Sequence, residues 1–186
     1  MLADLRAQVA ANQRGIALVQ ELIEQYGLKT IQAYMNYVQP NAEATIREMF
    51  KSVGHSLSSK SNELATIEEE NYMDDGSIIH LKLSIDSNKG EVIFDFAETS
   101  AEVYGNWNAP EAITAAFVIY CVRCLVNVDI PLNQGCLAPV KILIPEGSFL
   151  SPSDTAVVVG GSVLTSQRIT DVIFTTFKPL LVHRDV

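Results

Sequence analysis

Three loops rich in glycine, asparagine and proline hold the residues of this chain that are best suited to bind a small molecule. They span residues 105–110 (GNWNAP), 129–136 (DIPLNQGC) and 160–168 (GGSVLTSQR), each beside a strongly apolar segment. Glycine permits backbone shapes that other residues resist, and Asn, Ser, Thr and Gln add short hydrogen-bonding side chains. Because loops on packed elements commonly carry binding and catalytic groups, we expect the three to converge on one pocket. Each loop taken alone is explained more simply as a turn or a helix cap.

The loop at 160–168 is the strongest candidate site. Two glycines ahead of a helix expose first-turn N–H groups, and the helix dipole favours an anion there. The side chains that follow could hold a carboxylate or an acyl-phosphate oxygen, although a glycine turn before a polar helix start explains them equally well. The candidate catalytic residues are Ser166, Gln167 and Arg168, and the candidate substrate-binding residues are Asn106, Asn133, Gly160, Gly161 and Thr165.

Cys121 and Cys124 have the C-x-x-C spacing of zinc and redox sites. No second pair accompanies them, and both fall in an apolar segment that predicts a helix, where a free cysteine is usually a small core residue. With Cys136 the chain has three cysteines, which do not make a disulfide framework. We therefore expect no metal site and a reducing compartment.

The elements that must position these loops predict a mixed α/β fold. Residues 1–51 repeat apolar side chains at three- and four-residue steps, which indicates a helical hairpin with a stop at Gly27 and a break or kink at Pro40. Residues 64–99 alternate apolar and polar side chains between turn signals, which indicates an antiparallel meander.

Residues 105–177 complete the expected fold as a mixed α/β segment. Its helix at 109–126 is apolar nearly all round, so we expect it to be central and buried, with Asn108 as its N-terminal cap. Strands are expected at 140–144 and 156–159, and a further helix follows Gly161.

Composition restricts the class of protein. The chain has 186 residues, 48% of them apolar and 19% charged, which suits one globular domain or a piece of a larger one. Its net charge of −9 argues against nucleic-acid and anionic-membrane partners. No signal peptide opens the sequence, and the longest apolar run, 112–126, is too short to span a bilayer. We therefore expect a cytoplasmic protein.

Further sequence motifs accompany the loops in a fixed order: DLRAQVAANQ at 4–13, YMDDG at 72–76 and IYCVRCL at 119–125. With the loops, they make the chain resemble the hydantoinase B/5-oxoprolinase family, and most of all the C-terminal, hydantoinase B-like half of eukaryotic-type ATP-dependent 5-oxoprolinases. The resemblance identifies residues 1–186 as part of such a domain, and as a fragment. The chain departs from the family's sequence pattern at Glu98, at Ser162 and over a divergent tail, residues 174–186.

The resemblance implies a hydrolase that uses ATP to open the cyclic amide 5-oxo-L-proline to L-glutamate in glutathione turnover. It implies ATP and Mg²⁺ for the whole enzyme, with neither bound by this fragment alone. The implied partners are an actin-like ATPase half, the rest of the hydantoinase B-like half, and a second copy in a homodimer. Because the ATPase half is absent from the chain, we expect the fragment to be inactive alone.

Three alternatives stay open. The chain could belong to an N-methylhydantoinase-type amidohydrolase or to a relative of the ketone carboxylase large subunit. It could also be a non-catalytic fragment that only associates with the full enzyme.

Overall fold

The computed structural model describes residues 2–57 and 64–181, and the chain divides at Pro40 into two compact units. The first unit holds α1 (Leu2–Tyr26) and the beginning of α2 (Leu28–Leu57). Gly27 alone separates them, with a φ of 82° that favours glycine. The expected pair of N-terminal helices is therefore confirmed, and α2 is continuous through Pro40 rather than ending there.

The second unit is built on a four-stranded sheet of order β1-β2-β3-β4. The strands β1 (Ala65–Tyr72), β2 (Ile78–Asp86) and β3 (Glu91–Asp95) form the expected antiparallel meander. The chain then crosses through α3 (Glu111–Leu125) and returns as β4 (Val140–Leu143), which pairs parallel with β3. The mixed α/β class is confirmed.

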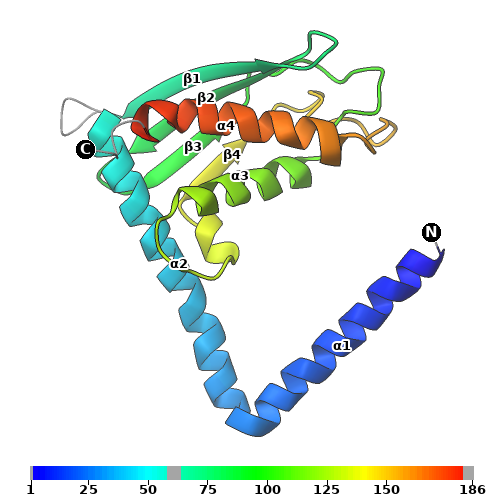
Figure 1. Cartoon of the computed structure of the whole chain (residues 1–186), viewed down its shortest axis with the longest axis vertical. Helices are drawn as coiled ribbons and strands as arrows, with labels where there is room; N and C mark the ends of the chain where they lie inside the picture. The colour runs from blue at the N-terminus through cyan, green and yellow to red at the C-terminus, as the bar shows by residue number, and fades with distance from the viewer. Residues whose placement is uncertain (1, 58–63, 182–186) are drawn as a thin grey trace. The chain divides into compact units, whose positions relative to one another are not determined.

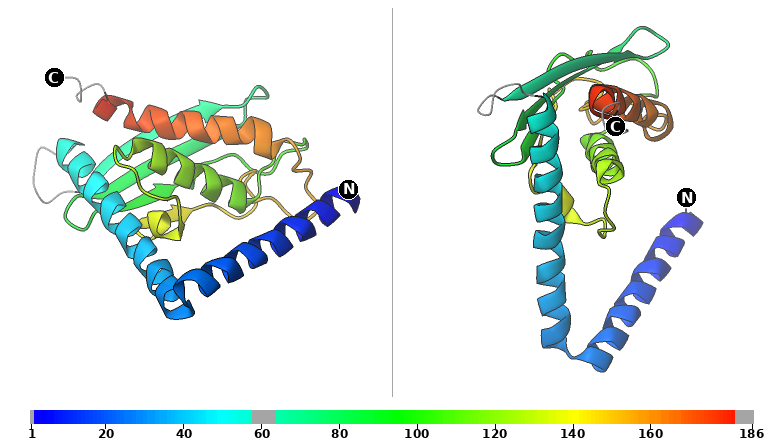
Figure 2. Two further views of the ribbon diagram at one scale, coloured as in Figure 1. Left: turned by 60° about the horizontal axis from the view of Figure 1, so that its bottom comes forward. Right: turned by 60° about the vertical axis from the view of Figure 1, so that its left-hand side comes forward.

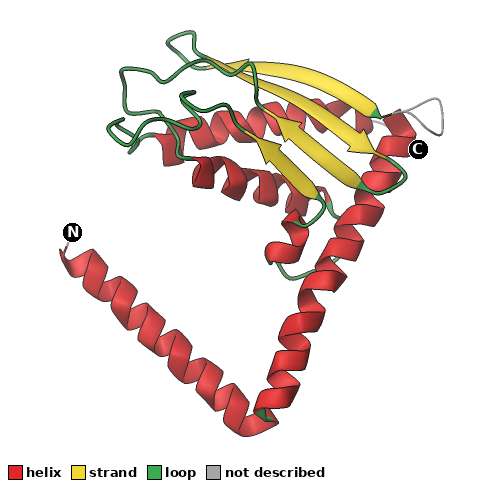
Figure 3. Ribbon diagram, turned by 180° about the vertical axis from the view of Figure 1, so that it is seen from behind, coloured by secondary structure: helices red, strands yellow, loops and turns green. Residues whose placement is uncertain are grey.

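The core lies between one face of this sheet and two helices, α3 and α4 (Ser166–Leu181) (Figure 1, Figure 3). The strand register aligns Leu83, Phe94 and Ile142 across β2, β3 and β4, so one apolar face is continuous. The opposite face is polar, with Glu68 and Lys82 paired across β1 and β2 at 2.8 Å. Helix α4 runs through Leu181, and the last residues of the divergent tail, 182–186, lie outside the described part of the chain.

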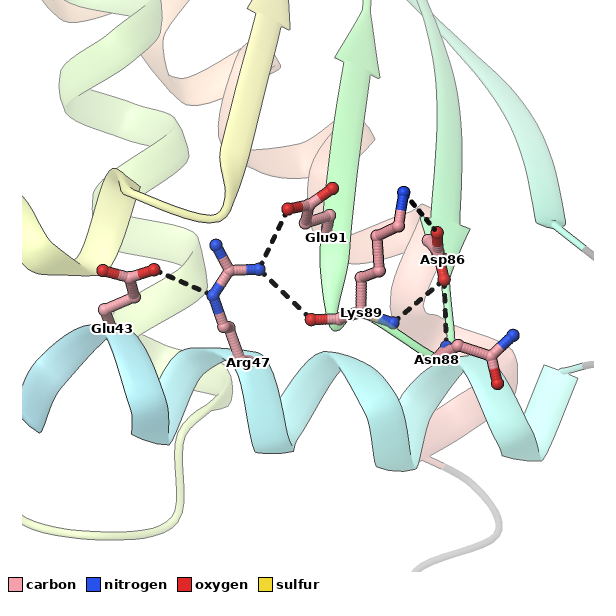
Figure 4. A network of polar contacts seen from close by, with 6 residues as sticks. All are labelled: Glu43, Arg47, Asp86, Asn88, Lys89 and Glu91. Carbon is pink, nitrogen blue, oxygen red and sulfur yellow. Dashed lines mark hydrogen bonds and ion pairs between the residues drawn. The ribbon is translucent and has the colours of Figure 1, made fainter. Parts of the chain in front are cut away.

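The C-terminal half of α2 is fastened to the β2–β3 turn by Arg47 (Figure 4). Its Nε contacts Glu43 at 2.8 Å, and its Nη1 contacts Glu91 at 3.2 Å and donates to the carbonyl of Lys89 at 3.1 Å. Hydrogen bonding to Glu43 is the largest cause that raises the pKa of Arg47. These contacts hold the end of the meander against the helix.

Three sequence expectations were wrong in this region. Residues 156–159 form no strand, because the segment lies between turns and Val157 and Val159 are exposed. Helix α3 begins at Glu111 after Pro110, with no side-chain cap from Asn108. It is also buried on one side only, since Tyr120 is 50% exposed. None of the helices in the described residues has the length and apolarity needed to cross a membrane.

Candidate functional site

Asn108 fixes the loop that carries Trp107. Its side chain is fully buried, and its Nδ2 donates to the carbonyls of Val103, Gly105 and Val157 at 2.9–3.1 Å. Its Oδ1 accepts the N–H of Val103 at 3.0 Å. Asn108 is therefore a structural residue that joins two loops, although it is not the helix cap that we expected.

The first and third loops are packed directly on each other. Gly160 donates its N–H to the carbonyl of Asn106 at 2.7 Å, and Thr165 donates its hydroxyl to the carbonyl of Trp107. A β-carbon at Gly160 would lie 2.9 Å from Asn106 Oδ1, and one at Gly161 would lie 2.9 Å from the Cα of Ala109. The two glycines therefore allow backbone to approach backbone.

The N–H groups at the start of the helix are largely engaged within the chain. Residues Gly161–Thr165 form a π-helical turn before α4, in which the N–H groups of Val163 and Leu164 both bond to the carbonyl of Gly160. Gly161 donates to Val158 at 3.0 Å. Ser166 is 2% exposed, and its hydroxyl donates to the carbonyl of Ser162. The N–H groups of Gly161, Val163 and Leu164 are therefore already engaged within the chain and are not available to hold the anion expected at this helix start.

A cavity of about 550 Å³ opens beside this turn. It is bounded by the β1–β2 turn, the Trp107 loop and the first turns of α4, and its lining residues are Met73, Asp74, Asp75, Trp107, Leu164, Gln167, Arg168 and Asp171. Of the three candidate catalytic residues, Gln167 and Arg168 line this cavity and Ser166 does not. Gly160, Gly161 and Thr165 do not line the cavity; Gly160 and Thr165 bond to the backbone of the loop that carries Trp107.

Arg168 is held between two carboxylates. Its Nη2 lies 3.6 Å from Asp74 Oδ1, and its Nη1 lies 3.8 Å from Asp171 Oδ2. The backbone N–H of Ser77, 3.0 Å from Asp75 Oδ1, is the largest cause that lowers the pKa of Asp75, so this carboxyl is ionised at neutral pH. Three carboxylates against one guanidinium make the cavity negative, which favours a ligand with N–H or O–H donors.

The indole of Trp107 adds a buried polar group beside these charges. Its Nε1 has no hydrogen-bond partner among the described residues, yet it is close enough to Asp75 to contribute to the lowered pKa of that carboxyl. Buried N–H groups without a partner are uncommon in folded proteins. The indole N–H is thus a further donor at the wall of the cavity.

The second loop lies elsewhere. Asn133 accepts the N–H of Gly135 at 2.8 Å and donates to the carbonyl of Pro131 at 3.1 Å, which shapes the short helix η1 (Gln134–Leu137). Arg123 Nε donates to Ile130, so this loop is held at the C-terminal end of α3, whereas the Trp107 loop precedes its N-terminal end (Figure 2). The helix has 15 residues and is about 22 Å long. The expected convergence of three loops therefore does not hold for Asn133.

Sequence reasoning missed part of this cavity. Asp74 and Asp75 lie in the turn between β1 and β2, in which Gly76 donates to Met73 at 3.0 Å, and a turn signal by itself does not indicate a site. Asp171 is not among the site residues expected from the sequence, although residues three and four apart share one face of a helix. Its spacing from Gln167 and Arg168 was the available signal.

The cysteines take up different environments. Cys121 is buried, and burial raises the pKa of its thiol to about 12, whereas Cys124 is exposed on the same helix. All three cysteines are free. Among the described residues, no three His, Cys, Asp or Glu side chains are grouped so that they could hold a metal ion.

Comparison with known proteins places the chain in a family. A sequence profile described as hydantoinase B/oxoprolinase matches residues 1–185, including the segment that begins at residue 174. The protein named 5-oxoprolinase 1 from Arabidopsis thaliana is 70% identical over 95% of this chain, and the match covers 14% of that protein. The protein named 5-oxoprolinase from Saccharomyces cerevisiae is 53% identical over 95% of this chain and 13% of its own length.

Solved structures show the same fold. The crystal structure of ATP-dependent caprolactamase from Pseudomonas jessenii matches 95% of this chain and 30% of that chain, with a TM-score of 0.77 and 18% sequence identity. The chain spans about one seventh of the curated relatives named above, so it corresponds to one part of much longer proteins. On the profile match and these identities, the chain belongs to the hydantoinase B/oxoprolinase family.

Proposed function

We propose that this chain is part of the hydantoinase B-like half of an ATP-dependent 5-oxoprolinase, which opens 5-oxo-L-proline to L-glutamate in glutathione turnover. The identity of 70% to a protein named 5-oxoprolinase 1 supports this reaction. In the structure, the cavity between Trp107 and Arg168 carries the proposal. Its volume of about 550 Å³ falls within the range of small-molecule sites.

In this proposal the cavity contacts the ring that is opened. Trp107 and Leu164 would pack against its methylene groups, and the ionised carboxylate of Asp75 would accept the ring N–H. The guanidinium of Arg168 would donate to the carbonyl oxygen, which gains negative charge when water adds to the ring carbonyl carbon, before the C–N bond breaks and the nitrogen leaves as an amine. Donors that are already oriented stabilise such a charge most effectively, and Asp74 and Asp171 orient Arg168.

The residues around this cavity do not fit a nucleotide triphosphate. The sequence contains no phosphate-binding loop motif. Three carboxylates against the single guanidinium of Arg168 would also repel a triphosphate much more strongly than the one carboxylate of 5-oxo-L-proline. ATP and Mg²⁺ would therefore be bound by the actin-like ATPase half, which together with the rest of the hydantoinase B-like half is the proposed partner. It follows that this chain alone releases no glutamate.

The test uses the complete enzyme and measures ATP-dependent release of glutamate. Arg168→Gln and Gln167→Ala are expected to lower kcat/KM by about tenfold or more, which is about 1.4 kcal/mol of transition-state stabilisation. The melting temperature should change little, because partly exposed ion pairs contribute little to stability. Lys178→Ala, exposed on the same helix, is the matched control. Unchanged kinetics for Arg168→Gln would contradict the assigned cavity, and glutamate release by this chain alone would contradict the division of labour.

A further inference from the structure

Asp75 lines the candidate cavity as a fixed hydrogen-bond acceptor. Its Oδ1 accepts the backbone N–H of Ser77 at 3.0 Å, and its Oδ2 accepts the hydroxyl of Ser77 at 2.8 Å. An ionised carboxylate has about four lone-pair sites and no donor. Ser77 therefore leaves Asp75 with unused capacity to accept, and this capacity is available to a ligand in the cavity.

Trp107 places an unused donor beside this carboxylate. Its Nε1 is buried and has no hydrogen-bond partner among the described residues. Ser77 contributes most to the lowered pKa of Asp75, and the indole N–H lowers that pKa further, so the two groups are near each other. Buried polar groups almost always have a partner in folded proteins. The carboxylate of Asp75 is the acceptor that this indole N–H serves.

The indole ring of Trp107 has a fixed position. A β-carbon at Gly105 would overlap its six-membered ring, so the glycine lets the ring lie directly on the backbone. The carbonyl of Trp107 accepts the hydroxyl of Thr165, and the neighbouring Asn108 is fully buried. Because the ring and its backbone are both held, the N–H keeps one direction and can orient a carboxylate on the adjacent turn.

A group that only accepts hydrogen bonds selects ligands by what they donate. A cyclic amide carries an N–H next to its carbonyl, and this N–H can donate to Asp75. A lactone of the same ring size has an oxygen there, whose lone pairs would meet the carboxylate and leave it unpaired. Sites built to hydrogen-bond a substrate N–H reject analogues that lack it. Ser77 and Trp107 strengthen this selection, because donors favour the ionised form of Asp75, which cannot donate to the lactone oxygen.

We infer that Asp75 is the specificity-determining residue of the cavity, which admits cyclic amides with a ring N–H and rejects lactones. Trp107 is a positioning residue, which holds the Asp75 carboxylate through its indole N–H. Both assignments rest on the proposed function of the cavity, and they add the ring atom that the cavity recognises.

Two ligands that differ at one ring atom test the selection. Saturation-transfer NMR titrations of the complete enzyme without ATP compare 2-pyrrolidinone, which has the ring N–H, with γ-butyrolactone, which has an oxygen in its place. The parent should bind the lactam at least about tenfold more tightly. Asp75→Asn should bring the ratio of affinities close to one, because an amide can donate as well as accept.

Asp74→Asn is the matched control for this titration. It removes the same charge from the same turn, but Asp74 has no printed role in holding Ser77, so the ratio of the parent should be kept. Equal affinity of the parent for the two ligands, or failure of the lactam to bind, would overturn the inference. So would a ratio that survives Asp75→Asn, or one that Asp74→Asn abolishes equally.

The pH dependence of binding tests the role of Trp107. Trp107→Phe keeps an aromatic ring and removes the indole N–H, so the pKa of Asp75 should rise and binding of 2-pyrrolidinone should be lost at a higher pH than in the parent. The other titratable groups of the cavity are Asp74, Arg168 and Asp171. Asp75→Asn should remove this acid limb, which separates Asp75 from them. An acid limb at the same pH in the parent and in Trp107→Phe would overturn the positioning role, because lost packing alone lowers affinity without moving a titration.

These titrations require no turnover, so they separate the selection from the reaction. An enzyme that releases no glutamate from 5-oxo-L-proline, yet selects the lactam through Asp75, would contradict the proposed reaction and support the selection. An enzyme that releases glutamate without selection by Asp75 would overturn the inference and leave the reaction standing.

Discussion

Gly160 donates its backbone N–H to the carbonyl oxygen of Asn106 over 2.7 Å, and this bond joins the loop before α3 to the turn before α4. The two residues are far apart in sequence, yet no side chain fits between them, since a β-carbon at 160 would lie 2.9 Å from the Asn106 amide oxygen. The wall of the candidate cavity therefore depends on a close backbone contact.

The neighbouring glycine should tolerate substitution poorly. In Gly161→Ala the added methyl would overlap the carbonyl oxygen of Asn108 and lie 2.9 Å from the Cα of Ala109, neither of which can move freely. We expect the free energy of unfolding to fall by about 1–3 kcal/mol, the usual cost of overpacking. Urea denaturation measures it. Gly15→Ala is the control: it meets nothing within 4 Å in a helix and should be neutral or slightly stabilising.

Asn108→Ala should destabilise the fold more than Asn106→Ala. The first removes the donor to three backbone carbonyls, and leaving buried polar groups unsatisfied costs about 1–3 kcal/mol each. The side chain of Asn106 is exposed, so its removal should stay within about 0.5 kcal/mol. Thermal or chemical denaturation of the two variants compares them directly, and equal effects would refute the structural role assigned to Asn108.

Acid should weaken the β2–β3 turn through Asp86. Hydrogen bonds from the backbone N–H groups of Lys89 and then Asn88 lower the pKa of this carboxyl in the folded chain. Because the folded pKa is the lower one, the carboxylate stabilises the fold above its unfolded pKa, near 3.9. That contribution is lost as the pH falls through the folded pKa.

Asp86→Ala should therefore lower stability at neutral pH and flatten its dependence on pH below about 4. Denaturant titrations at a series of pH values provide the measurement. Asp154→Ala, at an exposed position, should retain the pH dependence of the parent. If Asp86→Ala lost stability in acid as steeply as the parent, the turn would not be the origin of the effect.

The cysteines should react with a thiol reagent in two phases. Cys124 is exposed, whereas Cys121 and Cys136 are buried and burial raises the pKa of the Cys121 thiol to about 12. Since the thiolate is the reactive form, we expect one rapid equivalent in the folded chain and two more after unfolding. Cys124→Ser should abolish the rapid phase, and a rapid phase that persisted would place the reactive thiol elsewhere.

Much of the fold was predictable because it depends on local patterns. The alternation of apolar and polar side chains in β2 and β3, together with the glycines at the turns, predicts the meander directly. The strand predicted at 156–159 was wrong because the apolar residues of this segment are exposed beside a turn and are not paired in a sheet. The prediction that Asn108 caps α3 was also wrong. Its partners include Val157, 49 residues away, and no local sequence rule predicts such a contact.

The candidate site was predictable only in part. Gln167 and Arg168 were found because they follow a glycine pair at a helix start, and the cavity does include them. The charge of the cavity was not predictable, because Asp74 comes from a turn nearly a hundred residues away and reaches Arg168 only after folding. Asn133 shares the composition of the other loops, but η1 and Arg123 hold its loop at the far end of α3.

The π-helical turn at Gly161–Thr165 has a consequence for how this site can vary. The N–H of Ser166 bonds back to Gly161 across five residues, one more than an ordinary α-turn contains. Deleting one residue from this turn would convert it to an ordinary α-helical turn. The residues that precede the turn would then rotate by about 100° around the axis of α4. The width of the cavity beside Trp107 thus depends on the number of residues in the turn. A change in the length of the turn could therefore alter the size of the ligand that the cavity accepts without altering any lining side chain.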